Sequence, residues 1–213
     1  MQLLLPRFVV CLPQTYCSRK RKSCGSVFIA ICAGCRTGMG INMSILTGSQ
    51  ILEELNKGII IRPYHHENLT NNGYDLTLSK KIWVQAGGIK TNSNVISDDS
   101  IFEEVIIPDE GYVVIPHTLY IGRSNEYIES LSFIPKIAGK SSLARCGISV
   151  CMDATAGDIG YAGHWTLEII NHTLYPYRIY ANMPICRLEL YTPYGTYCEI
   201  HRSSYMGTST DKL

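Results

Sequence analysis

The residues best suited to chemistry in this sequence lie between Ala138 and Gly147, where two strand-like runs are joined. Residues 141–146 can form one or two turns of helix, whose first backbone N–H groups are free to bind an anion. Ser141, its neighbouring serine, the Lys140 ammonium and Arg145 can share one side of that turn. This combination predicts a phosphate site, and the alternative is a surface turn with chance basic residues. It is not a Walker A loop, because the GxxxxGK[ST] spacing is absent.

A second stretch, from Ala154 to Gly163, is rich in glycine and alanine, which lets the backbone approach a ligand closely. Within it, Asp158 could accept a hydrogen bond from a sugar hydroxyl. Tyr161 could stack on a ribose or a base. The alternative is a tight loop whose glycines have a positive φ, and the residues alone leave both open.

One acid stands in the strand-like run that follows, Trp165 to Asn171. Because strand side chains alternate, Thr166 and Glu168 should face one side and Leu167 and Ile169 the other. A carboxylate among such apolar neighbours is costly to bury unless it has partners or a task. It is therefore a candidate for proton transfer, with an ordinary solvent-facing strand Glu as the alternative.

Short strands are the elements that must position these groups. From Tyr74 onward, apolar and polar residues alternate with period two, and turn signals such as residues 108–111 recur at short spacing. The expected strands are 59–61, 74–79, 82–85, 102–107, 112–115, 119–122, 131–138, 148–151, 165–170, 177–180 and 185–191. About ten such strands are typical of an all-β sandwich or a jelly-roll-like barrel.

One helix of normal length is expected near the start of the strand-rich region. Thr47 or Ser49 can cap it, and Ile51, with the leucines that follow, forms one apolar face. Residues 56–58, Asn-Lys-Gly, end it. The pattern therefore predicts a single amphipathic helix ahead of the strands.

Composition narrows the class of protein. The 213 residues fit one domain with an appendage. They are 46% hydrophobic, enough for a sizeable core, and 17% charged with a net charge of +1, so we expect no nucleic-acid partner. No apolar run reaches the roughly 18 residues of a membrane span, so we expect no membrane segment either.

The first 42 residues differ from the rest, because they contain six basic residues, no acid and five of the nine cysteines. We expect residues 1–42 to be a disordered extension and residues 43–213 to form one domain. The extension is either an organelle transit peptide or lies outside the translated protein, with Met43 as the start. We favour the second hypothesis, because Met43 directly precedes the helix pattern. It implies a cytoplasmic protein, and the first an organellar one.

Taken together, these motifs resemble the dCTP deaminases of the dUTPase-like superfamily, from about Met43 to the C-terminus. The matching stretches are Gly73–Leu76 (like SYDVRL), Gly139–Gly147 (like GRSSLARLG), Asp158–Gly163 (like IDPGYxG) and Thr166–Asn171 (like TLExxN). The resemblance implies a mainly β, dUTPase-like distorted jelly-roll or β-barrel with one N-terminal helix and a short helix at 141–146. It also implies a homotrimer with active sites between subunits.

The resemblance implies a role for each matching position. Ser141 and Arg145 would handle the triphosphate and assist the catalytic water, and Glu168 would be the catalytic glutamate. The residues expected to bind substrate are Lys140, Ser142, Ala154, Asp158, Tyr161, Tyr205 and Gly207, the last two in a C-terminal lid. No residue is expected to bind a metal.

Three positions depart from the family pattern. Lys140 replaces the usual Arg and so keeps the charge but loses a bidentate fork. Ile159 replaces a proline, which leaves the register of residues 154–160 open. Arg187 stands where many members have Gln, so the role of that position is open too.

The function expected first is hydrolytic deamination of dCTP to dUTP and ammonia, with Glu168 as proton shuttle. Zinc is not expected, since zinc deaminases need an HxE and a later PCxxC, and the chain has no Pro-Cys dipeptide. Mg²⁺ would enter only with the triphosphate. The alternatives are a bifunctional enzyme that also hydrolyses dUTP to dUMP and pyrophosphate, and a non-catalytic nucleotide-sensing trimer. Inhibition by dTTP is a further expectation from the resemblance.

Overall fold

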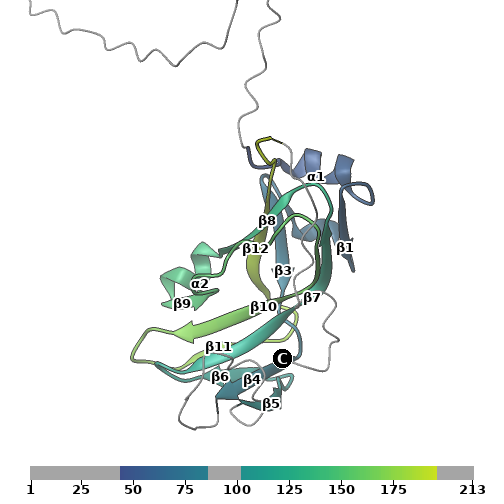
Figure 1. Cartoon of the computed structure of the whole chain (residues 1–213). Helices are drawn as coiled ribbons and strands as arrows, with labels where there is room; N and C mark the ends of the chain where they lie inside the picture. The colour runs from purple at the N-terminus through teal and green to yellow at the C-terminus, as the bar shows by residue number, and fades with distance from the viewer. Residues whose placement is uncertain (1–43, 86–101, 196–213) are drawn as a thin grey trace, which may run out of the picture. The chain divides into compact units, whose positions relative to one another are not determined.

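The computed structural model describes residues 44–85 and 102–195 (Figure 1). The expected extension 1–42 and the expected lid residues Tyr205 and Gly207 lie outside them.

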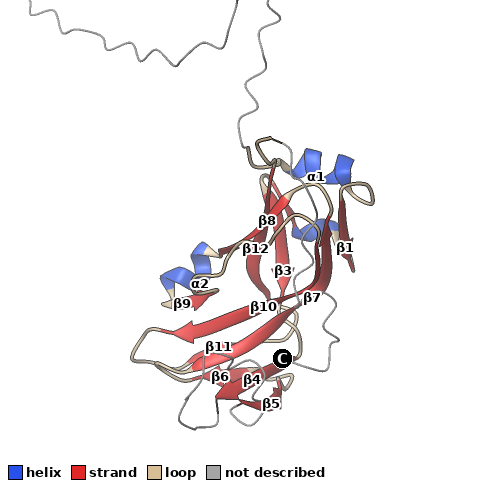
Figure 2. Ribbon diagram, in the orientation of Figure 1, coloured by secondary structure: helices blue, strands red, loops and turns tan. Residues whose placement is uncertain are grey.

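The helical elements are α1 (Gly48–Glu54), the 3-10 turn η1 (His66–Asn68) and α2 (Ser141–Arg145). The strands are β1 (Ile59–Arg62), β2 (Leu69–Thr70), β3 (Gly73–Thr77), β4 (Lys81–Gln85), β5 (Phe102–Ile106), β6 (Tyr112–Val114), β7 (Leu119–Ser130), β8 (Ile134–Gly139), β9 (Ile148–Val150), β10 (Tyr161–Asn171), β11 (Tyr177–Ile179) and β12 (Pro184–Tyr191). Within the described residues the protein is therefore mainly β, as expected (Figure 2).

Antiparallel pairing organises the described strands into three sheets. The central sheet has the order β5-β4-β7-β10-β9, and β1 pairs with β7 as well. A four-stranded sheet has the order β2-β3-β12-β8, and β11 pairs with β6. This is the distorted jelly roll that the resemblance implied. None of the helices in the described residues is long and apolar enough to cross a membrane.

The core lies where the alternating strands turn their apolar faces inward. Tyr74, Leu76 and Leu78 are fully buried, which confirms the period-two pattern read from the sequence. Leu188 of β12 pairs with Tyr74 and belongs to the same buried cluster. At the other end of the sequence, α1 begins at a capping box formed by Thr47 and Gln50, and it buries Ile51.

The prediction for β7 was wrong in length. It ended the strand at Gly122, because the residues that follow are largely polar, whereas β7 runs on to Ser130. The structure buries several of these polar groups and pairs them. Ser124, for example, donates to the backbone carbonyl of Glu126, and Ser130 donates to that of Phe133. Backbone pairing with β1 and β10, the buried Ile128 and these side-chain hydrogen bonds together keep this segment in the sheet.

Candidate active site

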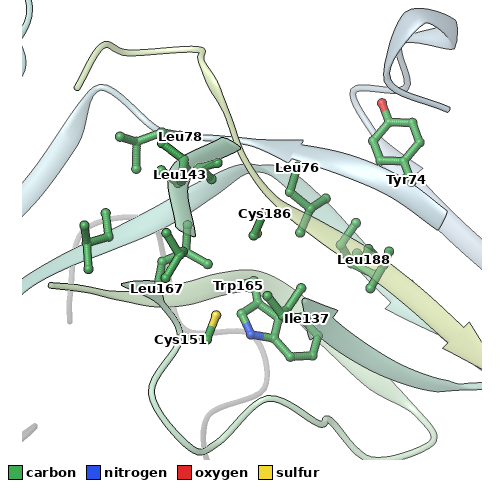
Figure 3. Packing of buried hydrophobic residues seen from close by; sticks show 14 of the residues in the cluster. Tyr74, Leu76, Leu78, Ile137, Leu143, Cys151, Trp165, Leu167, Cys186 and Leu188 are labelled. Carbon is green, nitrogen blue, oxygen red and sulfur yellow. The ribbon is translucent and has the colours of Figure 1, made fainter. Parts of the chain in front are cut away.

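The short helix α2 turns its polar side chains outward, as its spacing predicts. Ser141, Ser142 and Arg145 are exposed, whereas Leu143 is buried. Figure 3 shows Leu143 among the core side chains, in the same cluster as Leu78 and Leu167. One apolar anchor thus fixes a turn that presents two hydroxyls and a guanidinium to solvent, a donor set that suits phosphate oxygens.

Lys140, which precedes α2, has a protein partner. Its ammonium forms an ion pair with the carboxylate of Asp75 on β3. Arg187 of β12 pairs with the other oxygen of the same carboxylate, with 3.3 Å between Nε and Oδ1. The sequence comparison left Arg187 without a role, and the structure places it beside the candidate phosphate site.

The glycine-rich loop runs along the free edge of β8, the strand that leads into α2. The N–H of Ile137 donates to the carbonyl of Thr155 at 2.7 Å, and the N–H of Gly157 donates to that of Pro135 at 2.8 Å. These bonds fix how the loop pairs with β8, whereas its alignment with the family pattern stays a prediction. Ala154 and Asp158 are both exposed on this loop, so their side chains are accessible to a ligand.

The side chain of Tyr161 is already in contact with other residues of the fold. Its ring lies against Trp165, with 4.6 Å between ring centroids, and its hydroxyl donates to the carbonyl of His164. Burial raises the pKa of Tyr161 above its ordinary value, so the phenol stays neutral. The expected stacking on a ribose or a base remains untested, and in this structure the ring packs on the core.

Glu168 lies on β10 with the side-chain alternation that the sequence predicts. Leu167 and Ile169 are fully buried, Thr166 is exposed, and Glu168 is partly buried. Within residues 44–85 and 102–195, no hydrogen bond or ion pair to its carboxylate is present. A partly buried carboxylate without a protein partner is available to a substrate.

Cys151 lies beside Glu168. Its backbone N–H donates to the carbonyl of Glu168 at 3.0 Å, and its φ is +77°. Burial, followed by the charge of Glu168, raises the pKa of the Cys151 thiol to about 12. The thiol therefore stays protonated near neutral pH, and it is not a nucleophile.

These groups divide into two parts. One is a cationic, hydroxyl-bearing turn built on β3, β8, β12 and α2, and the other is a carboxylate on β10. In the described part of one copy, no hydrogen bond or ion pair joins the Glu168 side chain to α2. The first part can bind a polyphosphate, and the second can accept and return protons.

Comparison with known proteins identifies the family. The family model described as dCTP deaminase-like matches residues 45–192. The chain belongs to the dCTP deaminase-like family. A dUMP-forming dCTP deaminase from Clostridium botulinum (strain Alaska E43 / Type E3) is 35% identical over 165 residues, which cover 78% of this chain and 92% of that protein. Another, from Cytophaga hutchinsonii, is 35% identical over 153 residues, covering 72% of this chain and 85% of that protein.

A solved structure supports the family's fold. The crystal structure of 2'-deoxycytidine 5'-triphosphate deaminase from Agrobacterium tumefaciens superposes with a TM-score of 0.58 at 17% sequence identity. The match covers 71% of this chain and 48% of that one, so this chain spans about half the length of the solved protein. At this identity the likeness concerns the fold alone.

The names of the relatives correct one expectation. The function expected first from the sequence ends at dUTP, whereas the relatives from Clostridium and Cytophaga are named as dUMP-forming. The first expectation is therefore wrong on its product, and the bifunctional alternative is favoured. The motifs alone could not decide this, because both activities use a similar phosphate-binding turn.

Sequence reasoning also missed one residue beside the candidate phosphate site. Asp75 stood inside a quoted family stretch but received no role. The available signal was a lone acid in an apolar strand, the same signal that singled out Glu168. It was overlooked because its partners, Lys140 and Arg187, lie far away in the sequence.

Proposed function

We propose that this chain converts dCTP to dUMP, releasing ammonia and pyrophosphate. The observation that carries the proposal is the match to dUMP-forming relatives, which are 34–35% identical over 72–78% of the chain. The carboxylate of Glu168, which has no partner among the described residues, and the donor-rich turn at α2 would supply groups for both steps. Overall, dCTP and two waters give dUMP, ammonia and pyrophosphate.

In the first step, water adds to C4 of the cytosine, and N3 gains a proton. The C4–N bond then breaks as the new C4 hydroxyl loses its proton to become the carbonyl, and the amine takes up that proton and leaves as ammonia. Glu168 would carry two protons in turn: first one from the attacking water to N3, and then the one from the C4 hydroxyl to the leaving amine. Ser141 would hold the water, and Asp158 would accept a hydrogen bond from the sugar hydroxyl.

In the second step, water attacks the α-phosphorus and loses a proton to the solvent. The bond from that phosphorus to the oxygen that bridges it to the β-phosphorus breaks, and this oxygen leaves with pyrophosphate. Negative charge grows on the leaving pyrophosphate, which Ser142, Lys140 and Arg145 would stabilise. These residues offer donors and positive charge, which suit phosphate oxygens and not a cation. Mg²⁺ would therefore reach the site through the triphosphate.

A product assay tests the proposal. We expect dCTP to yield ammonia, dUMP and pyrophosphate in equal amounts, separated by anion-exchange chromatography, and dUTP to yield dUMP as well. Accumulation of dUTP as the sole nucleotide product would contradict it. Binding of dCTP without any product after long incubation would instead favour a nucleotide-sensing role. Addition of dTTP to the same assay tests the predicted inhibition.

We also propose a homotrimer whose active sites are shared between subunits. The two parts of the site support it, because α2 presents its hydroxyls to solvent and Glu168 lies on the face of β10 turned away from the core. Co-assembly of two inactive variants, Glu168→Gln and Arg145→Ala, is the test. If one site uses Glu168 of one copy and α2 of another, random mixing restores about a quarter of wild-type activity. No recovery in a mixed trimer would contradict the shared site.

A further inference from the structure

Two cations, Lys140 between β8 and α2 and Arg187 on β12, share one carboxylate beside α2. The Asp75 carboxylate receives the Lys140 ammonium on Oδ2 and Nε of Arg187 on Oδ1. The side chains of Asp75 and Lys140 are 15% and 20% exposed, and that of Arg187 is 34% exposed. The cluster is thus sheltered but open on one side, and it carries a net charge of +1 when all three groups are ionised.

Strand register brings these groups together. Arg187 of β12 lies opposite Asp75 of β3 on one side and opposite Ala138 of β8 on the other. Lys140 follows two residues after Ala138 and so extends from the same face of the sheet. That face is the partly exposed one, since Tyr74 and Leu76, which flank Asp75, point into the core.

Gly73 makes room for the arginine in this arrangement. A Cβ at that position would lie 2.9 Å from both Cγ and Cδ of Arg187, which is too close for a real contact. The Arg187 stem therefore crosses β3 where there is no side chain. A second contact, from Nη1 of Arg187 to Oδ1 of Asn72 at 3.5 Å, is long for a hydrogen bond.

We propose that Asp75 is a positioning residue that acts through Lys140, holding its ammonium at the start of α2 where a polyphosphate binds. A lysine stem is flexible, and fixing it before binding saves conformational entropy when the ligand arrives. An ammonium has three donors, so one can remain on Asp75 while others reach phosphate oxygens. The inference rests on the proposed function of this turn.

The charge of Arg187 allows the Asp75 carboxylate to lie beside a site for an anion. Asp75 with Lys140 alone would be a neutral pair, and the carboxylate would repel a phosphate. The guanidinium of Arg187 restores the excess positive charge without leaving the cluster. The position where many family members have Gln is thus used here for charge balance around Asp75.

The test compares Asp75→Asn with wild type in two measurements. One is the KM and kcat for dCTP, and the other is calorimetric binding of inorganic tripolyphosphate, which needs no turnover. We expect Asp75→Asn to raise KM and the tripolyphosphate Kd by about 5- to 10-fold, with kcat within about 2-fold. Asp109→Asn, an exposed acid in the turn before β6, is the matched control and should change neither.

A double-mutant cycle decides whether the effect runs through Lys140. We expect Asp75→Asn to add less than about 2-fold to the Kd of Lys140→Ala, because the group that it positions is already gone. Fully multiplying effects, or an unchanged or lower Kd for Asp75→Asn alone, would overturn the proposal. If Asp75→Asn does not fold, Asp75→Glu is the second variant. It keeps a carboxylate that can pair with both cations, but its longer side chain moves them. An unchanged tripolyphosphate Kd for Asp75→Glu would then overturn the proposal.

These experiments distinguish a failure of the proposed function from a failure of the positioning role of Asp75. Wild-type protein that makes no product from dCTP contradicts the proposed function, while tripolyphosphate binding still tests Asp75. Conversely, normal turnover by wild type with an Asp75→Asn variant of unchanged affinity removes only the positioning role. A merely structural salt bridge would lower the unfolding temperature of Asp75→Asn and leave both affinities as they are.

Discussion

Two acids on neighbouring strands of the central sheet, Glu126 of β7 and Glu168 of β10, have opposite surroundings. Glu126 is fully buried, and Thr77 donates to it twice, from its backbone N–H at 2.9 Å and from its hydroxyl at 2.8 Å. Glu168 is partly buried, and no group among the described residues donates to its carboxylate. Among the described residues, the fold therefore satisfies the first acid and supplies no donor to the second.

This difference indicates that Glu126 has a structural role and that Glu168 is available to a ligand. A buried carboxylate without donors would cost several kcal/mol, so Glu126 needs the two bonds from Thr77. Those bonds also tie β7 to β3, which belongs to the other sheet. Glu168 gains nothing comparable from the fold, and its position on a rigid, paired strand favours a task in catalysis.

Substitution of Glu168 by Gln should have the largest effect on activity. We expect ammonia release from dCTP to fall by about 10²- to 10⁴-fold, because the amide cannot carry protons between water and ring. The unfolding temperature should stay within about 2 °C of wild type, since the described residues lose no hydrogen bond to this side chain. Ammonia release and thermal unfolding measure the two quantities.

The matched control is Glu103→Gln, which changes an exposed strand glutamate on β5 in the same way. It should turn over dCTP at the wild-type rate. Robust deamination by Glu168→Gln, equal to that of this control, would remove the proposed proton shuttle and with it the contrast between the two acids.

Substitution of Glu126 should do the reverse. Glu126→Ala leaves the Thr77 donors unpaired in the interior, and we expect the free energy of unfolding to fall by about 2–3 kcal/mol. Glu126→Gln should cost less, about 1–2 kcal/mol, because it keeps one acceptor oxygen. Urea unfolding gives both values, and the KM for dCTP should stay within about 2-fold. Lost turnover at an unchanged unfolding midpoint would assign Glu126 to the active site instead.

The sequence predicted the fold best where burial follows a simple period. Alternation alone placed Tyr74, Leu76 and Leu78 in the core, and all three are fully buried. It failed in β7, where Arg123 to Ser130 include buried polar residues. Their stability in the sheet comes from hydrogen bonds and from contacts such as Arg123 over Trp83, at 5.1 Å. Partners such as Trp83 for Arg123 and Thr77 for Glu126 come from other strands, and a local pattern cannot show them.

In the candidate site, too, local spacing predicted which way side chains face, but it could not predict contacts between strands. Spacing within α2 correctly turned Ser141 and Arg145 outward, and alternation separated Glu168 from the core face. The ion pairs of Asp75 could not be predicted, because they depend on three strands lying side by side. The product could not be predicted either, since nothing in the local chemistry of the turn separates dUTP from dUMP as the end point.

The smallest effect that we expect is a pH dependence of stability centred on Glu126. Burial raises its pKa above the ordinary 4.5, and the bonds from Thr77 offset only part of that rise. The folded state therefore binds a proton more readily than the unfolded state. The stabilisation from protonation is fully present below about pH 4.5 and is lost as pH rises through the higher folded pKa.

Urea unfolding of wild type and Glu126→Gln from pH 4.5 to 7.5 isolates this contribution, because the other titrating groups cancel. We expect the wild-type advantage to shrink across that range, and an advantage that grows with pH would mean that the fold holds Glu126 as a stabilised anion.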